Sequence, residues 1–185
     1  MLEREDLPPK RDIGYAMGAN FFQASKQSAK ENRMGGLFSR LRLLIKRLNN
    51  HIYQLTARHL PIPRARVNLH RKRGVNIGKG VQIGPMVILE NPFPNAIYID
   101  DLVAISPGVT VVAHTKPPFW FKNKFPSYVD PVLIKRGVWV GVNVTILPGV
   151  TIGENSIVTP GSVVSKDVPP NTVVRGNPAE VVAKL

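Results

Sequence analysis

Aliphatic residues recur at every sixth position between Ile134 and Val164, and this period constrains the fold more than any other feature of the sequence. The row consists of Ile134, Val140, Ile146, Ile152, Val158 and Val164. A period of six fits neither an α-helix nor a strand whose side chains alternate between two faces. It fits a solenoid of short strands and tight turns, in which equivalent apolar residues stack from coil to coil. The sequence therefore predicts a mainly β fold.

The same spacing continues on both sides of this row. A second row runs four residues after the first: Val138, Val144, Val150, Ser156 and Ser162. Upstream, six-residue steps reappear in two groups: Ile77, Ile83 and Leu89, then Ile99, Ile105 and Val111. The phase slips by four near 91–95, and the period is lost over 112–131. Chance spacing in an ordinary β domain does not explain so many matches. Residues 74–168 are therefore predicted as the solenoid, with 112–131 as a loop inserted on its face.

The net charge of +13 is spread unevenly along the chain. Residues 1–73 hold 16 Lys and Arg against 5 Asp and Glu, whereas residues 74–185 hold 9 against 7. The basic character thus belongs to the part that precedes the solenoid. This part shows no nucleic-acid recognition motif, and we expect no nucleic-acid partner.

Residues 1–73 are predicted as a basic N-terminal tail followed by an amphipathic helix over 37–60. Apolar residues form one stripe at helical spacing: Leu41, Leu44, Ile45, Leu48, Ile52 and Leu55. The favoured interpretation packs this stripe on the solenoid flank and leaves the arginines in solvent. The alternative is weak peripheral contact of the helix with an anionic membrane. Residues 64–73 are expected to form a solvated cap, and 169–185 a C-terminal tail.

No stretch approaches the length of a membrane-spanning helix, and the charged N-terminus shows no signal peptide. The chain contains no cysteine, which excludes disulfides, thiol catalysis and Cys-ligated zinc. These features fit a cytoplasmic protein, with peripheral binding to the inner face of the membrane as the alternative.

Three segments carry a resemblance over residues 74–185. Ile105–Thr110 leads to His114, Gly137–Gly141 precedes Pro148–Gly153, and Gly161–Pro170 is closed by Gly176–Ala179. With them, the chain resembles the hexapeptide-repeat acyltransferases, most closely the maltose, galactoside and capsular-sugar O-acetyltransferases. This resemblance implies a left-handed parallel β-helix solenoid, here with an N-terminal α-helical appendage.

His114 is the candidate catalytic residue. The other three histidines precede the solenoid, whereas His114 lies where the period breaks into the inserted loop. Acyl transfer to a hydroxyl needs a base, and imidazole, with a pKa near 6.5, suits that step. The resemblance also aligns His114 with the family's catalytic histidine. Asp130 or Glu90 could orient its ring, and the sequence does not choose between them.

The resemblance implies acetyl-CoA as the acyl donor, bound in a groove between adjacent solenoids of a homotrimer. Its candidate binding residues are Gly141, Val142, Pro160, Gly161, Ser165 and Lys166, with Arg175 as a second phosphate partner. The alternative interpretation is that the glycines serve turns and that Lys166 is a surface lysine. No metal is expected.

The acceptor segment departs from the family pattern. Galactoside and maltose enzymes have an Asn-rich segment where this chain has Met86-Val87-Ile88-Leu89-Glu90-Asn91. Glu90, Asn91 and the loop residue Trp120 are the candidate substrate-binding residues for a sugar or glycan acceptor. The predicted activity is O-acetylation of a sugar hydroxyl, and the alternative is N-acetylation of an amino sugar or nucleotide sugar. A γ-carbonic anhydrase needs three zinc-binding histidines, which the solenoid lacks. A purely structural or membrane-anchoring role is a further alternative.

Overall fold

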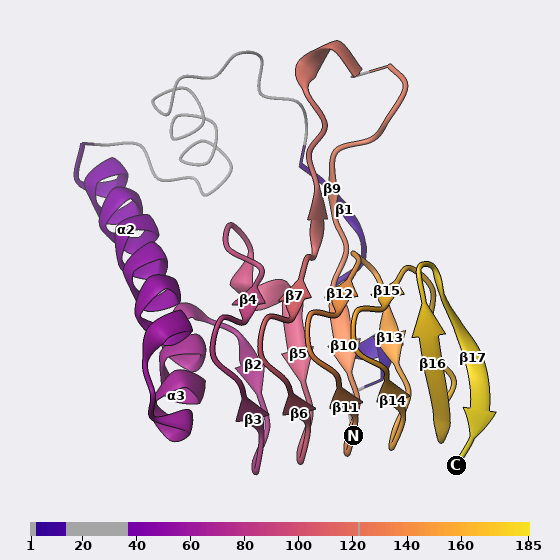
Figure 1. The fold of residues 1–185 in the computed structure, drawn as a ribbon. Helices are drawn as coiled ribbons and strands as arrows, with labels where there is room; N and C mark the ends of the chain where they lie inside the picture. Colours follow the sequence, from indigo (N-terminus) through magenta and orange to yellow (C-terminus); the bar gives the residue numbers. More distant parts are fainter. Residues whose placement is uncertain (1–2, 14–36, 122) are drawn as a thin grey trace.

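The computed structural model describes residues 3–13, 37–121 and 123–185, and its body is a solenoid of short parallel strands (Figure 1). The strands form three sheets that the chain visits in turn. The first sheet contains β2 (Asn76–Ile77), β5 (Ile97–Ile99), β10 (Val132–Ile134) and β13 (Thr151–Ile152). The second contains β3 (Gln82–Ile83), β6 (Ala104–Ile105), β11 (Trp139–Val140), β14 (Ile157–Val158), β16 (Thr172–Gly176) and β17 (Ala179–Lys184). The third contains β4 (Ile88–Leu89), β7 (Thr110–Val111), β12 (Thr145–Ile146) and β15 (Val163–Val164). The predicted mainly β fold is confirmed.

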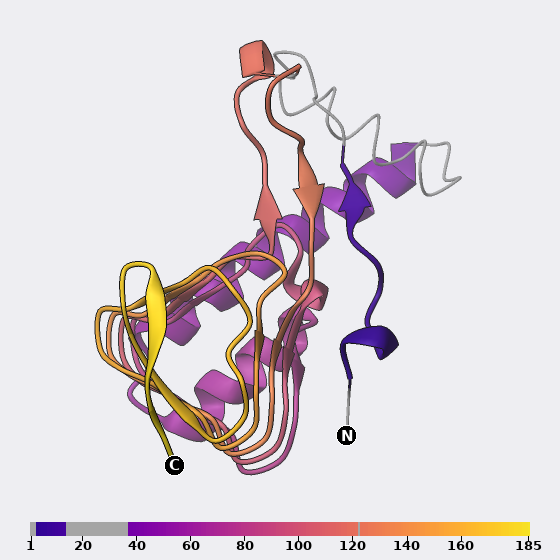
Figure 2. The ribbon, with the colours of Figure 1, turned by 90° about the vertical axis from the view of Figure 1, so that its right-hand side faces the viewer.

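The six-residue rows form the core of this solenoid. Ile134 pairs in register with Ile99 on one side and Ile152 on the other, and all three are at most 3% exposed. Seen along the axis in Figure 2, the coils overlie one another, which is why equivalent residues meet. The polar members of the second row are also buried, because their hydroxyls have partners. Ser156 Oγ donates to the Pro169 carbonyl at 2.7 Å, and Ser162 Oγ accepts from the Gly176 amide at 3.1 Å.

Within the described residues, two α-helices precede the first coil. Helix α2 (Leu37–His59) lies where the sequence predicts a helix over 37–60, and a second helix, α3 (Pro63–Arg73), lies between α2 and the strands. Pro63 begins α3, and Gly74 ends it with a left-handed φ of 101°. The segment expected as a solvated cap does cover the end of the solenoid, but three of its polar residues are buried: Arg66, His70 and Arg73.

The predicted packing of the apolar stripe is wrong. Helix α2 packs on α3 and β4 with its opposite face, where Gln54 and Ala57 are 5% and 1% exposed. The end of the solenoid presents backbone carbonyls, and polar side chains satisfy them: Gln54 Nε2 donates to the Val87 carbonyl at 3.4 Å. The polar face is therefore the inner one. Five stripe residues, Leu41, Ile45, Leu48, Ile52 and Leu55, are 42% to 59% exposed.

The inserted segment forms an antiparallel hairpin that projects from the solenoid (Figures 1 and 2). Its strands are β8 (His114–Thr115) and β9 (Tyr128–Val129), and the short helix η3 (Phe119–Phe121) lies toward its tip. On its other side β9 pairs with β1 (Arg11–Asp12), which follows η1 (Arg4–Asp6). The rest of the predicted tail, residues 14–36, lies outside the described residues.

The two ends of the solenoid are closed differently. The segment expected as a C-terminal tail supplies β16, which stacks in parallel on β14, and β17, which pairs antiparallel with β16. This pairing covers the last strand edge, which would otherwise present unpaired backbone groups. Among the described residues, no helix is long and apolar enough to cross a membrane.

Candidate active site

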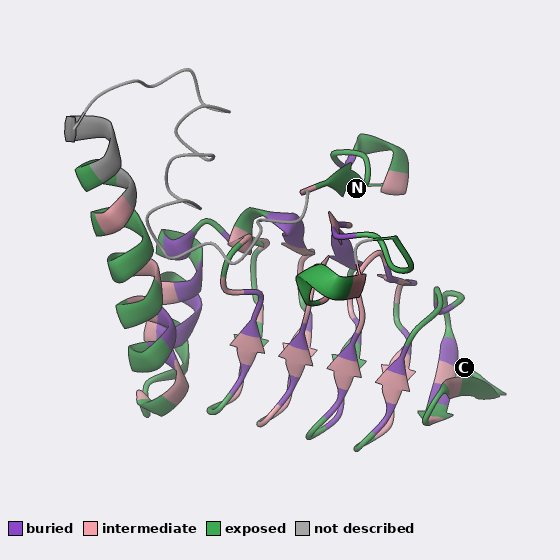
Figure 3. Cartoon of the chain, turned by 90° about the horizontal axis from the view of Figure 1, so that it is seen from above, coloured by how far each residue is buried: buried purple, intermediate pink, exposed green. Residues whose placement is uncertain are grey.

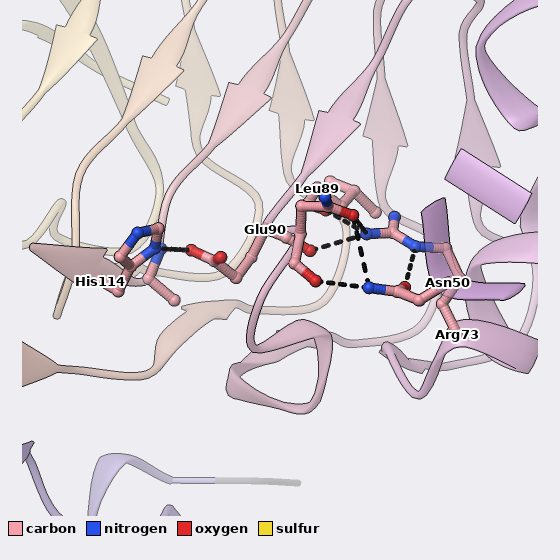
Figure 4. Close-up of polar contacts among 7 residues, drawn as sticks. Asn50, Arg73, Leu89, Glu90 and His114 are labelled. Atoms are coloured by element: carbon pink, nitrogen blue, oxygen red, sulfur yellow. Dashed lines mark hydrogen bonds and ion pairs between the residues drawn. The ribbon is translucent and has the colours of Figure 1, made fainter. Parts of the chain in front are cut away.

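His114 and Glu90 meet at the corner of the solenoid that follows the third sheet (Figure 4). Glu90 comes directly after β4, and β8 begins with His114 three residues after β7 ends, one coil later. The two coils are held in register, since the Glu90 amide donates to the Val111 carbonyl at 2.8 Å. The stacking of coils thus brings together two residues that are 24 positions apart.

The Glu90 carboxylate contacts the Nδ1 side of the His114 ring. Its Oε2 lies 2.8 Å from His114 Nδ1 and also accepts from the Ala113 amide at 2.8 Å. The Glu90 side chain is 1% exposed, whereas that of His114 is 25% exposed. Phe93 contacts the ring edge to face, with 5.7 Å between centroids. Because a carboxylate at Nδ1 favours the tautomer with its hydrogen there, Nε2 keeps the lone pair that a general base needs.

Behind this pair, Arg73 joins the helices to the end of β4 and to Glu90, which follows it. Its Nη2 donates to the carbonyls of Leu89 and Glu90 at 3.0 and 2.8 Å, and its Nε donates to Asn50 Oδ1 at 2.7 Å. Its Nη1 contacts Gln54 Oε1 and lies 3.0 Å from His70 Nδ1. One buried guanidinium therefore fixes the backbone on which the Glu90 side chain is mounted.

Burial is the main cause of the pKa shifts of His70 and Arg73. Burial and the neighbouring cations Arg73 and Arg66 lower the pKa of His70 to about 3, so His70 is neutral and accepts from Arg73. Burial lowers the pKa of Arg73 to about 10, against the opposing effect of Glu90, so Arg73 stays charged at neutral pH.

This network was not predicted, because residues 64–73 were expected to form a solvated cap. The spacing of Arg66, His70 and Arg73 at four- and three-residue steps was the available signal, since such residues share one helix face.

The candidate donor residues lie at two different corners. Gly141 and Val142 follow β11, and Gly161 stacks on them, since its amide donates to the Val142 carbonyl at 2.9 Å. Arg175, on β16, belongs to the next coil of that same corner, because the Thr159 amide bonds the Val174 carbonyl. Ser165 instead follows β15, at the corner of Glu90 and His114.

The first of these corners has little room for a side chain at its inner position. A Cβ on Gly141 would lie 2.7 Å from Pro160 N and 2.8 Å from the Val158 carbonyl oxygen. A Cβ on Gly161 would meet no atom within 4 Å, although its φ of 72° favours glycine. The structure exposes six of these candidate residues: Val142, Pro160, Gly161, Ser165, Lys166 and Arg175.

The other candidates are placed as follows. Asn91 Oδ1 lies 3.3 Å from both Asn50 Nδ2 and Arg73 Nη2, so the appendage already contacts it. Trp120 is 77% exposed on the hairpin. Asp130 pairs with Arg4 and not with His114, which removes it as the ring-orienting residue. No group of three or more His, Asp or Glu side chains that could hold a metal occurs in the described part of the chain.

The sequence of this chain is similar to a family model and to several known proteins. The model of the bacterial transferase hexapeptide family (six repeats) matches residues 131–166. CapG of Staphylococcus aureus is 37% identical over 120 residues, which are 62% of this chain and 69% of CapG. The galactoside O-acetyltransferase of Escherichia coli K12 is 40% identical over 90 residues, 48% of this chain but only 44% of that enzyme.

Solved structures show the same architecture. A hexapeptide-repeat acetyltransferase from Vibrio cholerae O1 biovar eltor, complexed with acetyl coenzyme A, superposes with a TM-score of 0.65 and 27% sequence identity. The superposition covers 78% of this chain and 89% of that one.

Proposed function

Because the chain belongs to the hexapeptide-repeat acyltransferase family, we propose that it is an acetyl-CoA-dependent O-acetyltransferase acting on a sugar or glycan hydroxyl. The observation that carries this proposal is the Glu90–His114 pair, a partly exposed imidazole held by a buried carboxylate. The acetyl coenzyme A bound to the Vibrio cholerae structure and the galactoside O-acetyltransferase relative support the donor and the acceptor class. Family membership also supports a left-handed winding of the solenoid.

In this proposal, His114 is the general base. Nε2 takes the proton of the acceptor hydroxyl while that oxygen attacks the thioester carbonyl of the donor. Acetyl-CoA supplies the acetyl group, and the bond between the acyl carbon and sulfur breaks as the ester forms. The imidazolium then returns its proton to the departing thiolate, so the histidine is restored at the end of each turnover.

Glu90 is proposed as a positioning residue. It fixes the Nδ1–H tautomer of His114 and stabilises the positive charge that the ring gains as it accepts the proton. The sequence suggested Glu90 as a direct sugar contact. Its buried Oε2 instead holds the histidine, and this geometry supports the positioning role. Asn91, beside it, and Trp120, on the hairpin, remain the proposed acceptor contacts.

The donor residues support a homotrimer. Gly141, Val142, Pro160, Gly161 and Arg175 share one corner of the solenoid, whereas Ser165 and Lys166 share the corner of His114. A donor in contact with both groups would span a face of one chain, or would lie between one corner and the other corner of a neighbouring chain. Three chains packed side by side make three such grooves, in which Lys166 and Arg175 can meet donor phosphates as cations.

A thioester-release assay tests the activity. The full chain is incubated with acetyl-CoA and a panel of neutral sugars, capsular oligosaccharides and amino sugars, and the free thiol and the mass of the product are measured. We expect thiol release that depends on one acceptor, with a product that alkaline hydroxylamine cleaves as an ester. Release independent of every acceptor, or a hydroxylamine-stable amide product, would contradict O-acetylation.

A further inference from the structure

The outer face of α2 is an exposed apolar surface at one end of the molecule. Leu41, Ile45, Leu48 and Ile52 lie along one side of the helix and are 46% to 59% exposed. Leu55 continues the row with 42% exposure. Figure 3 shows α2 as mostly exposed, beyond the first coil of the solenoid. We call these five residues the α2 stripe.

The α2 stripe is not needed to hold the helix on the protein. The opposite side of α2 does that through Ala57, Gln54 and Asn50, which contact α3, β4 and Arg73. At 100° per residue, Leu41 and Ile52 lie roughly opposite Asn50 and Ala57 on the helix. A surface of large aliphatic side chains that plays no part in the fold marks an interaction site.

A basic groove runs along one edge of the α2 stripe. It has a volume of about 820 Å³ and is lined by α2, the C-terminal end of α3 and the segment 92–95. The exposed cations Arg42, Lys46 and Lys72 are among its lining residues, and Ile45 belongs both to the groove and to the α2 stripe. Apolar and cationic side chains are therefore continuous on this end of the molecule.

We propose that the α2 stripe and the adjoining basic groove dock the protein on an anionic lipid bilayer. The aliphatic side chains enter the acyl boundary, while Arg42, Lys46 and Lys72 contact the headgroup phosphates. This arrangement of apolar and cationic side chains is typical of an interfacial amphipathic helix, which lies in the membrane plane and does not span the bilayer. The inference goes beyond the proposed acetyl transfer and does not depend on it.

The positive charge beside the α2 stripe favours an anionic bilayer over a second copy of the chain as its binding partner. Two copies joined stripe to stripe would bring their Arg42, Lys46 and Lys72 side chains together, and residues 1–73 hold 16 Lys and Arg against 5 Asp and Glu. Like charges at such a junction repel, whereas an anionic surface attracts them. Chains that pack side by side around an axis parallel to the solenoid would also place every α2 stripe at the same end, facing one plane.

Vesicle co-sedimentation of the full chain tests the proposal. Vesicles of phosphatidylcholine alone are compared with vesicles that also contain phosphatidylglycerol, at low and at high salt. A stripe variant carries Ile45→Ser, Leu48→Ser and Ile52→Ser, and its matched control carries Val181→Ser, Val182→Ser and Leu185→Ser, exposed residues at the opposite end. A charge variant carries Arg42→Gln, Lys46→Gln and Lys72→Gln, and its control carries Lys79→Gln, Lys124→Gln and Lys184→Gln.

We expect the full chain to bind the anionic vesicles and to lose binding at high salt, because salt screens the headgroup contacts. The stripe and charge variants should each bind at least roughly tenfold more weakly, while both controls bind like the wild type. Absent binding of the wild type, or equal binding of the wild type and both variants, would overturn the proposal. So would light scattering that shows the mass of the assembly halved in the stripe variant, since a second copy would then cover the α2 stripe.

Discussion

At the residue scale, the proposed role of His114 rests on the Glu90 carboxylate that contacts its Nδ1. Glu90 is almost fully buried, yet its Oε2 has two donors, the His114 ring and the Ala113 amide. A carboxylate withdrawn from water and aimed at Nδ1 can select the tautomer and offset the charge of an imidazolium. In the proposed mechanism the two residues have separate tasks: His114 moves a proton, and Glu90 orients its ring and stabilises its charge.

Glu90→Gln should lower turnover by about 10- to 100-fold, because the amide is close in shape but cannot offset the charge of the protonated ring. Donor affinity should be unchanged, since Glu90 is buried behind the histidine. Steady-state kinetics with calorimetric titration of coenzyme A checks both values. A loss confined to donor affinity would show that Glu90 serves binding and not the proton transfer.

The sequence alone did not decide whether Glu90 or Asp130 contacts the His114 ring. His114 is the candidate base because it lies where the six-residue period breaks. Its partner was left open between Glu90 and Asp130, because the coil that carries Glu90 is followed by the irregular segment 91–95, which hides how 90 aligns with 113. Asp130 is closer in sequence, but the hairpin turns it toward Arg4.

At the scale of elements, Arg73 links both helices to the solenoid. Its guanidinium has partners on α2, on α3 and after β4. Arg73→Ala leaves several of these buried groups without a partner, and we expect it to reduce the free energy of unfolding by about 3–5 kcal/mol. Chemical denaturation, with the exposed neighbour Lys72→Ala as control, measures the effect. Equal stability of the two variants would contradict this role.

The buried His70 predicts a pH dependence of stability. Its pKa is about 3 in the folded chain and about 6.5 when unfolded, so the unfolded state binds more protons between these values. Its contribution is complete above pH 6.5 and is lost as the pH falls, by about 1.4 kcal/mol per pH unit down to about pH 3. His70→Asn, which keeps an acceptor near the position of Nδ1, should remove this part of the slope. A variant with the same slope as the wild type would show that other groups cause it.

The helices also show what periodicity can and cannot decide. The apolar spacing predicted α2 within one residue of its observed end, but not which face it turns inward. An apolar stripe ordinarily packs inward, yet the end of this solenoid presents carbonyls that accept hydrogen bonds from Asn50, Gln54 and Arg73. The stripe alone could not reveal that α2 buries its polar face, whose groups have hydrogen-bond partners.

At the scale of the whole molecule, the solenoid was the predictable part. One short strand and one tight turn together repeat every six residues, and the registers of Ile99, Ile134 and Ile152 follow directly from this period. The hairpin over 112–131 and the antiparallel β17 were not predicted, because they interrupt or end the repeat. The candidate site forms where these regular and irregular parts meet.

The central claim, that His114 is the base of an acetyl transfer, is tested most directly by turnover and donor binding of His114→Ala. Once an acceptor is known, we predict a turnover lowered by about 10²–10⁴-fold, with coenzyme A affinity and thermal unfolding close to those of the wild type. The exposed histidine variant His59→Ala serves as the control and should retain wild-type turnover. Turnover of His114→Ala equal to that of His59→Ala would contradict the account.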